Sequence, residues 1–126
     1  MKLEMEFHGS IISDVKVGPN EIEIRFSHVA IITTPESSAT PKTNGGSASI
    51  KIGQPQYKRL PKKGVLSDGE LYGIPGKALN GRVPVDFTSN RECELELSIE
   101  NTEYTIAGKS FVISVDMATL PDELRH

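Results

Sequence analysis

Residues 21–27, EIEIRFS, decide the fold class of this chain. Ile22, Ile24 and Phe26 alternate there with charged residues, so a strand with a period of two carries the apolar side chains on one face and the charged ones on the other. Residues 94–100, ELELSIE, repeat this pattern. Such alternation is typical of antiparallel sheets that are covered on one face only, so the sequence predicts a β protein.

Further strands are predicted where alternating or β-branched residues recur between breakers. The breaker Gly18-Pro19-Asn20 and residues 100–103 are each short enough for a hairpin turn. We see no apolar spacing of an amphipathic helix, and only Pro121 suggests a single C-terminal helical turn. The further strands are expected at residues 2–7, 11–17, 29–33, 47–52, 83–87, 104–107 and 110–116.

We therefore predict one all-β domain over residues 1–126, a mainly antiparallel sandwich or partly open barrel of about eight or nine strands. At most a short helical turn is expected at its C-terminal end. The regular spacing of turn residues after residue 92 predicts that the last three strands form a meander. The chain is long enough to bury a core without a metal or a disulfide.

The composition indicates a soluble globular protein of the cytoplasm. Hydrophobic residues make up 37% and charged residues 25% of the chain, and no run approaches the roughly 18 apolar residues that cross a bilayer. Residues 1–6, MKLEME, lack the apolar core of a signal peptide. Cys93 is the only cysteine, so no intrachain disulfide can form, which favours a reducing compartment.

Two segments interrupt the alternation. Residues 34–46 are rich in Pro, Ser, Thr and Gly and are expected to form a mobile loop. Residues 53–82 contain scattered Pro and Gly and are expected to be irregular and basic. Residues 38–82 hold eight basic and two acidic residues, whereas residues 1–37 and 83–126 carry net charges of −3 and −6. A basic middle thus lies between two acidic, strand-rich ends.

The sequence AGKS at residues 107–110 is similar to the end of a phosphate-binding loop. In such a loop the first glycine would stand at Glu103, whose carboxylate would repel phosphate. The residues after Ser110 alternate as a strand, whereas a phosphate loop opens a helix. We interpret Gly108 as a turn residue that supplies a positive φ, and no nucleotide site is predicted.

The sequence predicts no catalytic residue, no cofactor site and no metal site. Cys93 alternates with Leu95, so we expect a core thiol rather than a nucleophile. His8 and His28 lack the spacing of a metal site. They remain candidates for a pocket that would hold a small ligand or serve an enzyme.

The sequence YKRLPKKG contains the only concentrated basic patch of the chain. We name Tyr57, Lys58, Arg59, Lys62 and Lys63 as candidate binding residues. Their charges suit an acidic protein partner, and they also suit a nucleic-acid strand with Tyr57 stacked on a base. A solvated loop without a ligand is the alternative to both.

Residues 6–32, EFHGSIISDVKVGPNEIEIRFSHVAII, resemble the opening of small bacterial β-domains of unknown function. In that pattern an aromatic residue or Leu precedes His-Asp-Ser. Here Phe7, His8, Gly9 and Ser10 follow the pattern except at Gly9, where the family has Asp. Some of these domains look like immunity proteins, which bind and neutralise a toxin, so the resemblance implies a bacterial origin and a protein partner.

Our leading hypothesis is a non-enzymatic bacterial domain that binds a protein, because the uneven charge creates two contrasting surfaces. A small-ligand binder or enzyme with a pocket near His8 and His28 is the first alternative. A weak single-stranded nucleic-acid binder through residues 57–63 is the second. We expect no cofactor and no membrane association, and pairing of exposed strand edges between copies of the chain is compatible with each hypothesis.

Overall fold

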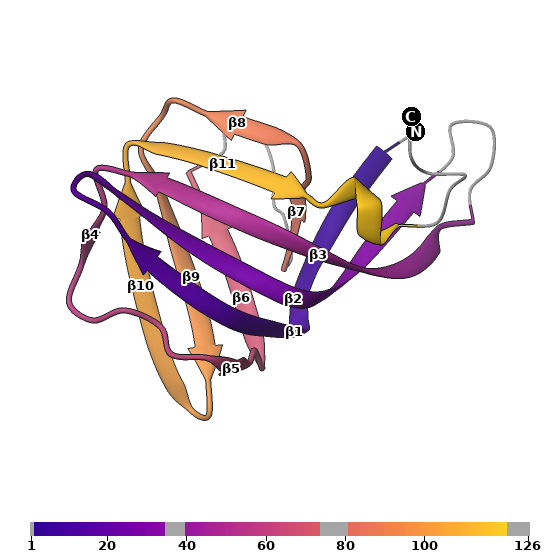
Figure 1. Cartoon of the computed structure of the whole chain (residues 1–126), viewed down its shortest axis with the longest axis horizontal. Helices are drawn as coiled ribbons and strands as arrows, with labels where there is room; N and C mark the ends of the chain where they lie inside the picture. The colour runs from indigo at the N-terminus through magenta and orange to yellow at the C-terminus, as the bar shows by residue number, and fades with distance from the viewer. Residues whose placement is uncertain (1, 35–39, 74–80, 121–126) are drawn as a thin grey trace.

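The computed structural model describes residues 2–34, 40–73 and 81–120 and consists of two antiparallel sheets packed face to face (Figure 1). This confirms the all-β prediction, and the chain adopts a sandwich rather than a closed barrel. The described residues form eleven strands, more than expected. Four of these strands have only two or three residues, too few to produce a pattern in the sequence.

We call the larger sheet, of seven strands, sheet A and the smaller, of four, sheet B. The strands of sheet A are β1 (Lys2–Val17), β2 (Glu21–Thr34), β3 (Lys42–Gly53), β5 (Gly64–Val65), β7 (Arg82–Pro84), β8 (Phe87–Ser89) and β11 (Ser110–Val115). The strands of sheet B are β4 (Gln56–Tyr57), β6 (Asp68–Tyr72), β9 (Cys93–Ile99) and β10 (Thr102–Gly108). Sheet A runs in the order β5-β1-β2-β3-β11-β8 with β7 also paired to β1, and sheet B in the order β4-β10-β9-β6.

The core lies between the sheets and is built from the apolar faces that the alternation predicts. Ile22, Ile24 and Phe26 of β2 are at most 1% exposed. They belong to one buried cluster with Leu95 and Cys93 of β9, which are 0% and 2% exposed. The predictions for both alternating segments and for the core thiol are therefore confirmed.

Strand β1 bends at a bulge around Gly9, whose φ of +80° suits glycine. Its register with β2 shifts between Glu6 and Ile11, and β1 pairs with β7 before the bulge and with β5 after it. The buried Ser10 hydroxyl donates a hydrogen bond of 2.7 Å to the Phe7 carbonyl and is thereby satisfied. The bend carries the far parts of β1, β2 and β3 beyond the sandwich (Figure 1).

The predicted C-terminal meander is wrong, because β10 and β11 follow each other in the chain but belong to different sheets.

The strand after Gly108 confirms that the AGKS motif is a turn and not a phosphate loop. Gly108 does not supply a positive φ, however. A Cβ atom there would collide with the Ile52 side chain, and the next residue, Lys109, donates its N–H to the Gly53 carbonyl at 3.0 Å. Glycine is needed because the chain crosses between the sheets at this point.

The described parts of the two interrupting segments contain strands. Strand β3 already begins at Lys42, so it takes up the last part of the loop expected at 34–46, and residues 35–39 lie outside the described ranges. The irregular segment 53–82 contributes three short strands, and residues 74–80 are again outside the described ranges.

The turn of the β9–β10 hairpin and the described C-terminal residues agree with the expected hairpin turn and the expected short helical turn. Glu100 and Asn101 have φ values of 49° and 65°, as a two-residue hairpin turn requires. The only helical element among the described residues is the 3-10 turn η1 (Met117–Thr119), which Asp116 caps through the Ala118 N–H. The turn expected from Pro121 lies outside the described residues.

Candidate functional site

Edge strand β4 places Tyr57 on the surface of sheet B. Tyr57 is paired with Ile106 of β10, and its own outer side has no neighbouring strand among the described residues. The N–H of Gln54, just before β4, donates to the Asn20 carbonyl at 2.8 Å and so fastens this segment to the β1–β2 turn. Tyr57 is thereby held at a defined position although it remains 39% exposed.

Two grooves meet at Tyr57. The strand groove, of about 600 Å³, lies along β10, and the tip groove, of about 420 Å³, lies at the ends of the neighbouring turns. Both volumes fall in the range of ligand-binding clefts, about 300–1,000 Å³. The two grooves share only Gln56 and Tyr57. The edge strand therefore forms the ridge between them.

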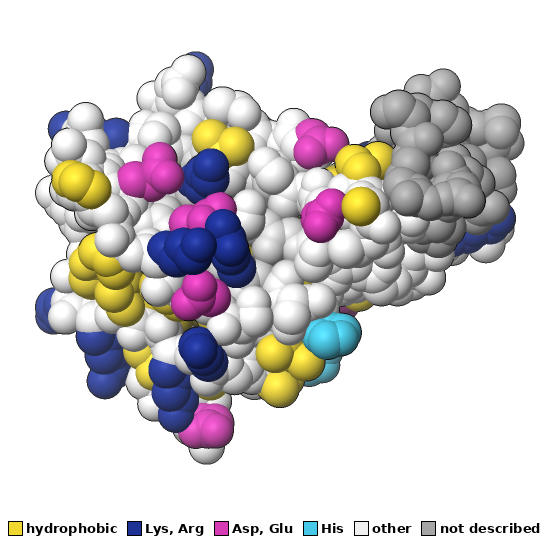
Figure 2. All heavy atoms as spheres, in the orientation of Figure 1, with side chains coloured by type: hydrophobic (Ala, Val, Ile, Leu, Met, Phe, Trp, Pro, Cys, Tyr) yellow, Lys and Arg dark blue, Asp and Glu magenta, His cyan; other side chains and the backbone are white. Residues whose placement is uncertain are grey.

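The tip groove has an apolar wall. Val17, which is 58% exposed, lines it together with Pro19, Pro55 and Tyr57. Figure 2 shows hydrophobic side chains gathered on this end of the sandwich, with basic side chains around them. A large exposed apolar side chain next to an exposed tyrosine is a common feature of protein-binding surfaces.

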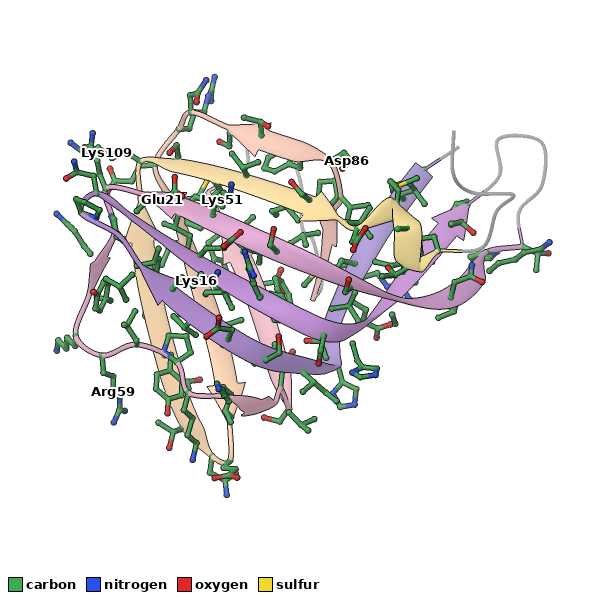
Figure 3. The ribbon with its side chains drawn as sticks, in the orientation of Figure 1. Lys16, Glu21, Lys51, Arg59, Asp86 and Lys109 are labelled. Atoms are coloured by element: carbon green, nitrogen blue, oxygen red, sulfur yellow. The ribbon has the colours of Figure 1, made fainter. Side chains whose placement is uncertain are left out.

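The strand groove carries both signs of charge. Lys58 and Arg59 line it from the β4 side, and Glu94 and Glu103 line it from β9 and β10. The guanidinium of Arg59 lies 5.3 Å from the centre of the Tyr104 ring, a cation–π contact that orients it. Figure 3 shows Arg59 and Lys109 on either side of β4, so cationic side chains lie near both grooves.

The predicted basic patch is divided in the folded chain. Tyr57, Lys58 and Arg59 come together in the strand groove. Lys62 instead forms an ion pair of 2.6 Å with Glu100 at the tip of the β9–β10 hairpin. The hydrogen bond and the attraction between these two exposed groups raise the pKa of Lys62 and lower the pKa of Glu100. Lys63 is exposed and lines neither groove.

The two histidines lie near the bulge of β1 and line neither of the grooves at Tyr57. His8 contacts the Ser67 carbonyl through Nδ1 at 2.7 Å, and His28 contacts the Ser27 hydroxyl at 3.1 Å. Ile11, three residues after His8, is paired with His28. The contact of His8 joins β1 to the connection between β5 and β6, whereas the contact of His28 stays within β2. Within the described part of the chain, no group of three or more His, Cys, Asp or Glu side chains is arranged to hold a metal ion.

Sequence reasoning missed Glu94, Glu103 and Tyr104 as members of this surface. They are distant from Tyr57 in the sequence, and only the pairing of β4 with β10 brings them together. The alternation of β10 indicates which of its residues face outward, but it says nothing about the neighbouring edge strand.

Comparisons with protein-family models, with curated proteins and with solved structures found no match for this chain. The described residues contain no helix that is long and apolar enough to cross a membrane.

Proposed function

We propose that this chain is a non-enzymatic protein-binding domain that holds its partner at the β4 edge. The observation that carries the proposal is the position of Tyr57, partly exposed on the ridge between two grooves. Tyrosine and arginine are enriched among the residues that contribute most to protein–protein binding. Arg59 is oriented by Tyr104 beforehand, so less side-chain entropy is lost when it binds.

The chemistry of the two grooves suggests what the partner presents. An apolar side chain of the partner would enter the tip groove beside Val17 and Tyr57. A carboxylate would pair with Lys58 or Arg59 at the strand groove. Glu94 in the same groove favours a protein of mixed charge over a nucleic-acid strand, because phosphates would be repelled there.

The resemblance of residues 6–32 to immunity-like domains supports a more specific version of this proposal, in which the partner is a toxin and the complex forms in a bacterial cytoplasm. The β4 edge would then be the surface that neutralises the toxin.

The test is an affinity capture from the native organism's lysate with matched variants. Tyr57→Ser removes the aromatic ring from the ridge between the two grooves. Tyr72→Ser is the control, because it removes a comparably exposed tyrosine from the opposite edge strand of sheet B. We expect a protein that is retained at moderate salt by the wild type and by Tyr72→Ser and is lost with Tyr57→Ser. Equal retention by all three proteins, or recovery only of nucleic acid that salt removes, would contradict the proposal.

A further inference from the structure

A third groove opens on the outward face of sheet A and has a floor of small polar residues. Its volume is about 410 Å³. Ser49 of β3 and Ser114 of β11 are directly paired on this floor, and Arg25 of β2 is paired with Ser49 from the other side. Ser47 and Asp116 line the end near η1. We call this the serine groove.

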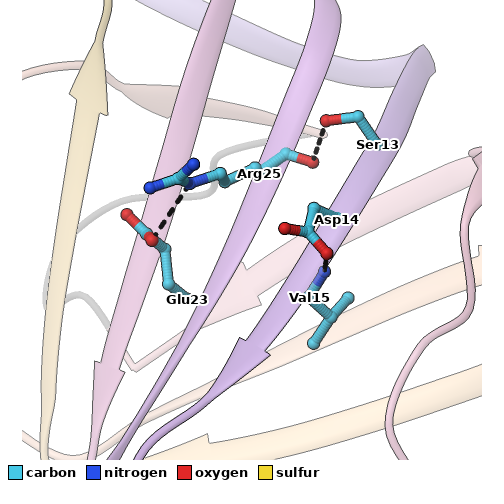
Figure 4. A network of polar contacts seen from close by, with 5 residues as sticks. All are labelled: Ser13, Asp14, Val15, Glu23 and Arg25. Atoms are coloured by element: carbon cyan, nitrogen blue, oxygen red, sulfur yellow. Dashed lines mark hydrogen bonds and ion pairs between the residues drawn. The ribbon is translucent and has the colours of Figure 1, made fainter.

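The groove exists because side-chain size changes along the sheet. In the next outward row, Lys51 is paired with Val112, and both side chains are larger than serine. The long Arg25 forms one wall, and its Nε donates to the Glu23 carboxylate at 3.1 Å (Figure 4). On the other side of β2, the Ser13 hydroxyl donates to the Arg25 carbonyl at 3.3 Å. The side chain of the wall is thus held by Glu23 of the same strand, and its backbone is held by Ser13 of β1.

Several hydrogen-bonding groups of the serine groove have no partner within the described residues. The hydroxyls of Ser47, Ser49 and Ser114 make no hydrogen bond there. Arg25 uses only Nε toward Glu23, so its two terminal nitrogens remain available. One carboxylate oxygen of Asp116 accepts from the Ala118 N–H at 3.1 Å, and the other oxygen is available.

The groove offers no apolar anchor. Phe26, Ala48 and Val115 line it, but these residues are at most 7% exposed and point their side chains into the core. A peptide that depends on an apolar side chain for affinity would gain little here, in contrast to the tip groove.

The surroundings of the serine groove are electrically balanced. Basic and acidic residues alternate across the strands, and Figure 2 shows them alternating down the middle of this face beside an area of uncharged groups. The basic residues are Lys16, Arg25 and Lys51 and the acidic residues are Asp14, Glu21, Glu23 and Asp116, so the two signs nearly cancel. A charged ligand would therefore gain little from long-range attraction, whereas a neutral polar ligand would lose nothing.

We propose that the serine groove binds a neutral saccharide. A sugar hydroxyl is both a donor and an acceptor, and the groove presents hydroxyls of the same kind next to the donor Arg25 and the acceptor Asp116. The proposal goes beyond a protein partner at β4, because it assigns a second ligand class to the other sheet. Sheet A would recognise a carbohydrate while the edge of sheet B holds a protein.

The test is a titration of the full chain, followed by NMR of its backbone amides, with glucose, galactose, mannose, N-acetylglucosamine and their common disaccharides up to tens of millimolar. We expect at least one of these sugars to shift the amides of residues 47–49 and 114–116. Ser114→Val, a substitution that strands tolerate, should weaken this binding by about tenfold or more, because it removes a hydroxyl and fills the floor. Thr88→Val is the matched control, since Thr88 is exposed on sheet A, pairs with Val112 and does not line the groove.

The proposal is overturned if no sugar shifts the amides of the groove, or if sugars shift only those around Tyr57. It is also overturned if Ser114→Val and Thr88→Val bind the sugar equally well. None of these outcomes depends on the protein-capture experiment, so the two proposals fail separately.

Discussion

The outward faces of the two sheets differ in how charged residues are paired across neighbouring strands. On sheet A, Glu23 is paired with Lys16 on one side and with Lys51 on the other. On sheet B, Glu70 of β6 is directly opposite Glu96 of β9. The first arrangement cancels its own field, and the second places like charges side by side, which costs about 0.2–1 kcal/mol per cross-strand pair.

Sheet B tolerates this repulsion because its other face is buried. Leu71 and Leu95, one residue further along the same strands, are paired inside the core. Each such side chain contributes about 1.5–3 kcal/mol, more than the repulsion costs. The like charges still affect a neighbour: the pKa of Tyr72 is raised, first by the nearby Glu96 carboxylate and then by burial. Hydrophobic burial thus decides the fold of both sheets, and charge decides only what each face can bind.

The largest effect should come from the core that the two faces share. Phe26→Ala should lower the free energy of unfolding by about 3–5 kcal/mol, because the buried ring lies in the single cluster between the sheets. Urea titrations followed by circular dichroism and by tyrosine fluorescence measure this. Both signals should change in one transition, and two separate transitions would mean that the sheets unfold independently.

The next effect concerns the crossing between the sheets. Gly108→Ala should cost about 1–3 kcal/mol, because the new methyl group would meet the Ile52 side chain and the Gly53 carbonyl. Gly45→Ala is the control, since a Cβ there has no neighbour within 4 Å. Thermal unfolding of both variants gives the comparison, and similar stability of the two would contradict the role of Gly108.

A smaller effect distinguishes the two faces directly. Glu96→Gln should raise stability by a few tenths of a kcal/mol, because it relieves the repulsion with Glu70. The same change at Glu23 should lower stability by less than about 1 kcal/mol, because it weakens the ion pair with Arg25. Effects of the same sign in chemical denaturation would disprove the contrast between the faces.

The Glu96→Gln protein also allows a direct titration. The pKa of Tyr72 should fall toward its ordinary value, because the carboxylate that contributes most to its rise is gone. Ultraviolet or NMR titration of the tyrosines measures this shift. An unchanged Tyr72 would mean that burial, rather than the acidic face, raises its pKa.

The smallest effect on stability is expected from the Lys62–Glu100 ion pair at the β9–β10 hairpin. The lowered pKa of Glu100 means that its pair with Lys62 stabilises the fold above the ordinary glutamate pKa and loses this contribution as the pH falls through the lowered value. The raised pKa of Lys62 means that the contribution is lost again as the pH rises through that value. The stability difference between the wild type and Glu100→Gln should therefore be slight at neutral pH and vanish in acid. Glu92→Gln is the control, and a difference that persists in acid would contradict the pair's role.

Part of the candidate site could be predicted from the sequence. The aromatic and basic residues of the YKRLPKKG segment are visible as a group, and three of them, Tyr57, Lys58 and Arg59, line one groove. The sequence could not separate them from Lys62, because the ion pair with Glu100 joins residues 38 positions apart. The serine groove was missed altogether, since its serines are scattered over four strands and each looks like an ordinary outward residue.

By itself the sequence determined where the longer strands lie and which of their faces are buried, but it did not reveal the strands of two or three residues. The alternation around Ile24 and Leu97 and the turn at Asn101 were sufficient for this, because period and turn geometry depend on neighbouring residues only. The tertiary structure alone decided that β11 pairs with β3 in sheet A instead of with β10 in sheet B. It also decided that β4 lies beside β10 and that the strand groove, the tip groove and the serine groove form. Strand partners are chosen by the burial of apolar surface between distant segments, and no local pattern records which segment will be opposite.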